Sequence, residues 1–314
     1  MQPQPASSAT YHPGIARSTL PQGGRRDGTV RLADGRTLGF AQYGDPAAPP
    51  VLYFHGYPSS RLEAGLIPIP GVRLISPDRP GYGLSDPKPG RTLLDWARDV
   101  DALLDALHLD RVGLIGMSGG APYAAACAHA IPHRLTGTAL VSGMGPPGFG
   151  WEAGSPAGFL MGLGRRPLAL RTLAHTARGF IRGGDPLALA GLLRRRAGLP
   201  PSDRVLLNAD AGEKVVAGWR EAVRLGVHGP LSDALIYARH WGFALEGIRG
   251  AVSVWHGTAD TTVPVAAGRL LADRIPGARA HILEGEGHFS LIFKHHPAIL
   301  RELLDGGAGR VRAA

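Results

Sequence analysis

Short apolar segments bounded by turn residues recur along the chain from residue 28 onward. Val51–Phe54 is followed by His55-Gly56, and Val72–Ser76 is followed by Pro77-Asp78. Such segments are typical of strands that are buried on both faces of a parallel sheet. The same pattern predicts further strands at Val112–Met117, Leu135–Val141, Ala251–Trp255 and Ala280–Leu283.

Helical segments alternate with these strands. Apolar residues recur at positions 93, 94, 96, 97, 100, 103, 104 and 107, which favours a helix over Leu93–Leu107. Thr29–Leu32 and Thr37–Tyr43 flank Asp34-Gly35 and predict a hairpin. The alternation predicts an α/β fold, in which a mostly parallel central sheet carries helices on both faces. Further helices are predicted at Ala121–Ala130, Val263–Ile275 and Ile292–Leu304.

The alternation stops between residues 146 and 247, a stretch rich in Leu, Arg and Gly. We interpret this stretch as several helices inserted into the sheet domain, above a site carried by the sheet. The predicted organisation is a disordered leader at 1–27, a core at 28–145 and 248–305, a helical cap at 146–247, and a tail at 306–314.

Composition narrows the class of protein. With 44% hydrophobic residues, the chain can build a core despite its 46 glycines and 27 prolines. The net charge of +9 comes mainly from arginines scattered among acidic residues, so no nucleic-acid partner is expected. The single cysteine, Cys127, excludes an internal disulfide framework and a cysteine zinc cluster. We expect a cytoplasmic protein without a membrane span, metal or cofactor, and leave its oligomeric state open.

The strongest chemical signal is Gly116-Met117-Ser118-Gly119-Gly120. It lies between a predicted strand and the Ala121–Ala130 helix, which is the context of a G-x-S-x-G nucleophile elbow. A sharp turn there lifts the Ser118 hydroxyl off the sheet, and small neighbours allow close packing. Gly116–Gly120 lacks the Lys-Ser/Thr ending of a phosphate loop. We therefore expect Ser118 to be a nucleophile.

A nucleophilic serine needs a base, and the base needs an acid that orients it. His288 follows Glu286-Gly287 shortly after a predicted strand, and Asp260 lies in a loop after the Ala251–Trp255 strand. The order Ser118, Asp260, His288 matches one known order of triad residues. Asp260 could equally cap the helix that follows it. Most of the other histidines are expected to be structural.

Together these motifs make the chain resemble the α/β-hydrolase superfamily, with the fold and inserted cap that the family implies. The matching segments occur in the family's order and lie within about 28–145 and 248–305. The resemblance identifies His55-Gly56-Tyr57-Pro58 as an oxyanion loop, in which the backbone N–H groups of Tyr57 and Gly119 would be the donors. The other matching segments are Asp78–Asp86, the Ser118 elbow, His256–Asp260 and Gly285–Phe289.

The resemblance implies a serine hydrolase that cleaves a small, apolar carboxylic ester or lactone through an acyl-enzyme. Proline iminopeptidases, C–C bond hydrolases and cofactor-free perhydrolases share this pattern, and a non-catalytic ligand receptor on the same fold is a further alternative. Epoxide hydrolases and haloalkane dehalogenases have a similar loop but use an aspartate where this chain has Ser118.

Aromatic side chains of the cap are candidates for the substrate pocket, although they could equally be the buried faces of cap helices. An iminopeptidase would also need a cap carboxylate for the substrate amine, for which Glu152, Glu213 and Glu221 are candidates by residue type. The cap arginines could bind an acidic substrate or simply face solvent. The candidate pocket residues are Trp151, Phe159, Trp219 and Trp241.

Overall fold

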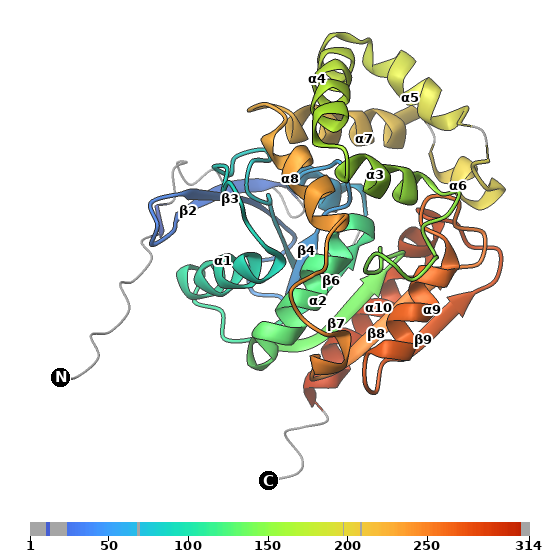
Figure 1. Ribbon diagram of the computed structural model, residues 1–314. Helices are drawn as coiled ribbons and strands as arrows, with labels where there is room; N and C mark the ends of the chain where they lie inside the picture. The colour runs from blue at the N-terminus through green and yellow to red at the C-terminus, as the bar shows by residue number, and fades with distance from the viewer. Residues whose placement is uncertain (1–10, 13–23, 68–69, 197, 208, 309–314) are drawn as a thin grey trace.

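The fold is described from a computed structural model, which covers residues 11–12, 24–67, 70–196, 198–207 and 209–308 (Figure 1). Most of the predicted leader and residues 309–314 of the predicted tail lie outside this part of the chain. The sheet order is β1-β2-β3-β5-β4-β6-β7-β8-β9. The strands are β1 (Tyr11–His12), β2 (Arg26–Arg31), β3 (Thr37–Tyr43), β4 (Pro50–Phe54), β5 (Arg73–Pro77), β6 (Val112–Met117), β7 (Leu135–Val141), β8 (Val252–Gly257) and β9 (Arg279–Leu283).

The sheet has an antiparallel edge and a parallel body. β2 pairs antiparallel with both β1 and β3, and β3 pairs antiparallel with β5. From β5 through β4, β6, β7 and β8 to β9, every neighbouring pair is parallel. The predicted mostly parallel sheet is therefore confirmed. β2 begins at Arg26, two residues before the predicted start of the core.

Helices cover both faces of the sheet, as the alternation predicted (Figure 1). Leu52 and Phe54 point to the face that packs against α1, α2 and α9, whereas Val51 and Tyr53 point to the face covered by α10. This alternation follows from the two-residue period of a strand. These helices are α1 (Leu93–Ala106), α2 (Ala121–Ala130), α9 (Val265–Arg274) and α10 (Ser290–Ala308).

In the part of residues 146–247 that the structure describes, six helices form a single insertion between β7 and β8, above the edge of the sheet at which the parallel strands end (Figure 1). In Figure 1, α4 and α5 lie farthest from the sheet. Short 3-10 turns complete the structure, among them η1 (Arg61–Leu66) and η2 (Ser118–Gly120). The helices of the insertion are α3 (Pro156–Gly164), α4 (Pro167–Gly183), α5 (Pro186–Arg194), α6 (Pro201–Leu206), α7 (Ala209–Ala222) and α8 (His228–Tyr237).

A fully buried carboxylate on α8 fastens the insertion to the sheet domain. Asp233 forms ion pairs with Arg79, at 2.8 Å, and with Arg91. The hydroxyl groups of Tyr82 and Tyr123 also donate to Asp233, at 2.8 and 2.5 Å. Asp233 and Arg79 are each 0% exposed, so their charges compensate each other without water.

Among the described residues, no helix is long and apolar enough to cross a membrane.

Candidate active site

The Ser118 turn has the geometry of a nucleophile elbow. Ser118 directly follows β6 and precedes α2, and its φ of 54° is a left-handed value that is unusual for a residue other than glycine. Such a backbone is maintained only where the surroundings fix it, typically at functional sites. A Cβ at Gly116 would lie 2.6 Å from Ala124 Cβ, so glycine is needed there for α2 to pack against the strand.

His288 and Asp260 form a buried, hydrogen-bonded pair. The Nδ1 atom of His288 lies 2.7 Å from Asp260 Oδ2, and His288 lines the same cavity as Ser118. Ser118 follows β6, Asp260 follows β8 and His288 follows β9. Since these strands are parallel, their carboxyl ends bring the three residues to one edge of the sheet. The three residues predicted from the sequence therefore lie together.

Asp260 does not cap α9, one of the two roles that the sequence left open, because that helix begins at Val265 after Pro264 and has no side-chain cap. Its Oδ1 atom accepts from the backbone N–H groups of Thr262 and Val263, at 2.8 and 2.9 Å, in the turn before α9. Its Oδ2 atom faces His288 and lies 3.4 Å from Nε2 of His256. One oxygen thus fixes the carboxylate to its own loop while the other is available to orient the imidazole.

The protonation of the pair is set by competing effects. Burial lowers the pKa of His288, but the carboxylates of Asp260, Asp203 and Glu63 outweigh this effect and raise it above its usual value of 6.5. Burial disfavours the charged form of Asp260, but the contacts with His288 and His256 lower its pKa overall. Asp260 is therefore ionised and can stabilise the imidazolium that forms when His288 takes a proton.

The predicted oxyanion loop lies directly beside the elbow. A Cβ at Gly119 would lie 2.9 Å from Tyr57 Cβ, so the two residues whose N–H groups are the predicted donors are in close contact. The Tyr57–Pro58 peptide bond is cis. Arg79 supports this loop by donating to the carbonyl groups of His55 and Gly56, at 2.5 and 2.9 Å.

One cavity of about 150 Å³ contains Ser118 and His288. Of the four predicted pocket residues, Trp219 lines it and the other three do not. Trp151 and Trp241 are buried as members of the main core cluster, and Phe159 is 66% exposed. Helical periodicity cannot separate these environments, because it identifies an apolar face but not what covers that face.

Glu63 is a charged group of this cavity and is not among the residues predicted from the sequence. Its Oε1 atom accepts from the N–H of Gly56 at 2.9 Å and from the hydroxyl of Tyr53 at 3.0 Å. A methyl group on Gly56 would lie 3.4 Å from Glu63 Oε2 and 3.5 Å from Ser118 Cβ, so both residues lie against Gly56. Glu63 follows the oxyanion loop on a short 3-10 turn, and no residue pattern marks it.

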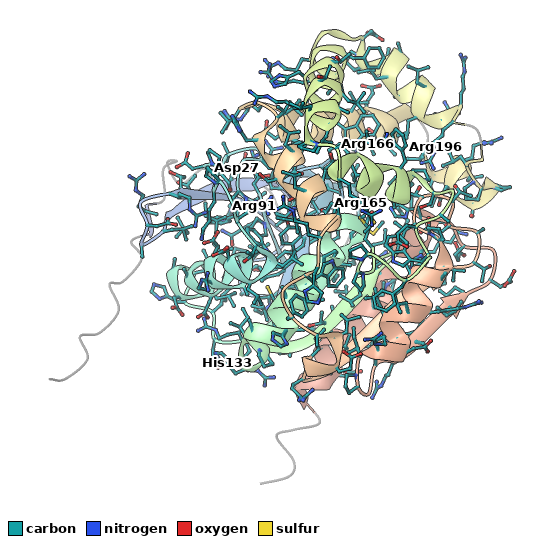
Figure 2. The ribbon with its side chains drawn as sticks, in the orientation of Figure 1. Asp27, Arg91, His133, Arg165, Arg166 and Arg196 are labelled. Carbon is teal, nitrogen blue, oxygen red and sulfur yellow. The ribbon has the colours of Figure 1, made fainter. Side chains whose placement is uncertain are left out.

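Arginines of the insertion differ in their environment. Figure 2 shows Arg165, Arg166 and Arg196 among the helices of the insertion, and Arg91 among the elements below it. Arg196 lines the cavity and donates to Thr262 Oγ1 and Thr261 O, each at 3.1 Å.

Within the described ranges, no group of three or more His, Cys, Asp or Glu residues is placed to hold a metal ion.

Comparison with known families agrees with the fold. Residues 49–295 match the alpha/beta hydrolase fold family. The chain belongs to this family. This alpha/beta hydrolase is 28% identical to a pimeloyl-(acyl-carrier protein) methyl ester esterase of Aromatoleum aromaticum, over 79% of the chain and 94% of that protein.

Two other relatives of this alpha/beta hydrolase differ in the extent of the match. A non-heme chloroperoxidase of Streptomyces lividans is 36% identical over 38% of the chain, and the match spans 45% of that protein's length. An alpha/beta hydrolase fold protein from Nakamurella multipartita, known from its solved structure, is 29% identical with a TM-score of 0.59. That match covers 90% of this chain and 100% of the other.

Proposed function

We propose that this alpha/beta hydrolase is a serine hydrolase that cleaves a small carboxylic ester or lactone through an acyl-enzyme. The observation that carries the proposal is the buried His288–Asp260 pair in the same cavity as Ser118, whose backbone is left-handed. This combination supplies a nucleophile, a base and a group that orients the base. The similarity to the Aromatoleum esterase supports ester cleavage.

The reaction would proceed in two steps. His288 takes the Ser118 proton as Oγ attacks the substrate carbonyl, and the backbone N–H groups of Tyr57 and Gly119 stabilise the oxyanion. The tetrahedral intermediate then collapses, and the alcohol leaves with the proton from His288. Water, deprotonated by His288, attacks the acyl-enzyme and releases the acid.

The cavity supports a small, partly apolar substrate. Its volume of about 150 Å³ accommodates a group about as large as benzene. Leu66, Val215, Trp219 and Phe293 contribute apolar surface, and Glu63, Arg196 and Lys214 contribute charges. We also propose that residues 146–247 form a cap that closes this cavity, over a core at 28–145 and 248–305.

The test is hydrolysis of p-nitrophenyl acetate and butyrate by the purified protein and by S118A. We expect turnover by the wild type and a loss of at least about 10³-fold in S118A. Removal of a serine outside the cavity, S232A on α8, serves as the control. Equal rates in S118A and the wild type would refute the assignment, and the absence of turnover by a folded wild type would favour a ligand receptor.

Glu63 favours a second candidate, hydrolysis of an ester or amide whose acyl part carries an amine. The carboxylates that the sequence suggested for this role lie outside the cavity lining. Glu221 pairs with Arg61 at 2.6 Å, Glu152 accepts from Gly148 N at 2.6 Å, and Glu213 is exposed. Glu63, in contrast, lines the same cavity as the nucleophile, where a carboxylate could bind an ammonium group.

Paired substrates test this candidate. Alanine ethyl ester and ethyl isobutyrate have the same shape, but only the former carries an ammonium group. We expect the wild type to prefer the amine, and E63Q to lose that preference by about 10-fold or more, while E213Q keeps it. A wild type that prefers isobutyrate would contradict the second candidate and leave the first intact.

A further inference from the structure

A second buried carboxylate of the insertion contacts the loop that carries the catalytic base. Asp203 lies on α6 and is 0% exposed. Its Oδ2 atom accepts from the backbone N–H of His288 at 2.9 Å. Its Oδ1 atom accepts from those of Phe289, at 3.0 Å, and Ser290, at 2.8 Å. One side chain thus satisfies three consecutive backbone donors.

These donors lie at the start of α10, where the first N–H groups of a helix have no partner within the helix. A residue next to the helix normally caps them. Here the cap comes from a different part of the chain, since 85 residues separate Asp203 from His288. The approach is close, because a Cβ at Gly287 would lie 2.5 Å from Asp203 Cγ. Any side chain at Gly287 would therefore displace either the carboxylate or the loop.

We propose that Asp203 is a positioning residue, through which the insertion fixes the backbone of His288 and thereby the alignment of the base with Ser118. The proposal rests on the proposed serine-hydrolase function. It adds that the insertion is part of the catalytic machinery as well as a cover for the cavity. The imidazole is then held from two sides, by Asp260 at its Nδ1 atom and by Asp203 at its backbone N–H.

A purely structural helix cap would stabilise the fold without changing the titration of His288. Asp203 is expected to change both the stability of the fold and the titration of His288, because its negative charge, like those of Asp260 and Glu63, raises the pKa of His288. Arg196 and Lys214 line the same cavity, and His256 contacts Asp260. All of these groups remain in place when Asp203 alone is changed.

The experiment compares D203N with D185N, using p-nitrophenyl butyrate between pH 5 and 9. Asp185 is a matched control, because it caps α5 within the same insertion through Ala188 N at 2.8 Å and does not line the cavity. In D203N we expect kcat/KM to fall on the order of 10- to 100-fold, and the acid limb of its pH profile to move to lower pH. D185N should have the kcat/KM and the acid limb of the wild type. D203E keeps the negative charge and should therefore retain an acid limb close to that of the wild type.

A folded D203N with wild-type kcat/KM and an unmoved acid limb would overturn the proposal, as would a fall in kcat/KM without movement of that limb. If D203N does not fold, amide exchange in the unaltered protein decides. The amides of His288, Phe289 and Ser290 should be protected, and exchange as fast as in an exposed loop would overturn the proposal. This readout does not depend on turnover, so its failure is distinct from inactivity of the wild type, which refutes the proposed function.

Discussion

Removal of the buried charge at Asp233 should destabilise the protein more than most single substitutions. D233N keeps the shape of the side chain but leaves Arg79 and Arg91 without a counter-ion, at 0% and 1% side-chain exposure. It also places the NH₂ group of the new asparagine beside the hydroxyl groups of Tyr82 and Tyr123, which donate to Asp233 in the wild type. Breaking a buried pair by removing one partner costs about 3–5 kcal/mol in the free energy of unfolding, because an uncompensated charge stays buried. For a chain of this size, Tm should fall on the order of 10 °C.

Urea denaturation followed by circular dichroism measures this loss. D210N is the control, because Asp210 pairs with Lys214 at the surface and its side chain is 73% exposed. That substitution should change the free energy of unfolding by less than about 0.5 kcal/mol. A D233N variant within about 1 kcal/mol of the wild type, with an unchanged m-value, would refute the reasoning.

The pH dependence of the difference between wild type and D233N follows from linkage. Burial disfavours the charged form of Asp233, but Arg79 and Arg91 lower its pKa below the usual value. A carboxylate with a lowered folded pKa contributes stability that is complete above its unfolded pKa of about 3.9 and is lost as pH falls toward the folded pKa. The difference between the two proteins should therefore be constant from pH 5 to 8 and shrink below about pH 4.

Three further predictions concern the site and its supports. The acid limb of kcat/KM should lie above pH 6.5 in the wild type, because the raised pKa of His288 keeps the base protonated at lower pH. D260N should lower kcat by about 10⁴-fold and move the acid limb to lower pH. A pH-rate profile of the two proteins measures both effects. G116A should lower the free energy of unfolding by about 1–3 kcal/mol in urea titrations, because its Cβ would lie 2.6 Å from Ala124 Cβ. Burial raises the pKa of the Cys127 thiol, so iodoacetamide should modify it in urea but not in the native protein, as judged by mass spectrometry.

The sheet, and the placement of Ser118, Asp260 and His288 at one edge of it, could be predicted because both depend on local patterns. Strand segments such as Val112–Met117 are apolar throughout because both faces are covered, and β6 spans the residues predicted for it. Ser118, Asp260 and His288 each follow a strand of the parallel sheet, so the topology alone brings them to one edge. Their chemistry is therefore carried by short segments of sequence.

Contacts between the insertion and the core could not be predicted in the same way. Asp203 and Asp233 look like ordinary helix residues, and only the packing of α6 and α8 shows that each carboxylate is buried against distant groups. The pocket was also mostly misassigned, since Trp151 and Trp241 belong to the core. An apolar residue on a helix satisfies the same periodicity whether it faces a cavity or another helix.

The insertion is fastened to the sheet domain at several separate points, and this limits how a substrate can enter. Asp203 binds the His288 loop, Glu221 pairs with Arg61 at 2.6 Å, and Asp233 is surrounded by core side chains. A lid that swung away as one rigid body would have to break all of these contacts together. Opening is therefore expected to be local, through the outer α4–α5 segment and the side chains at the mouth of the cavity, while α6, α7 and α8 stay docked during turnover.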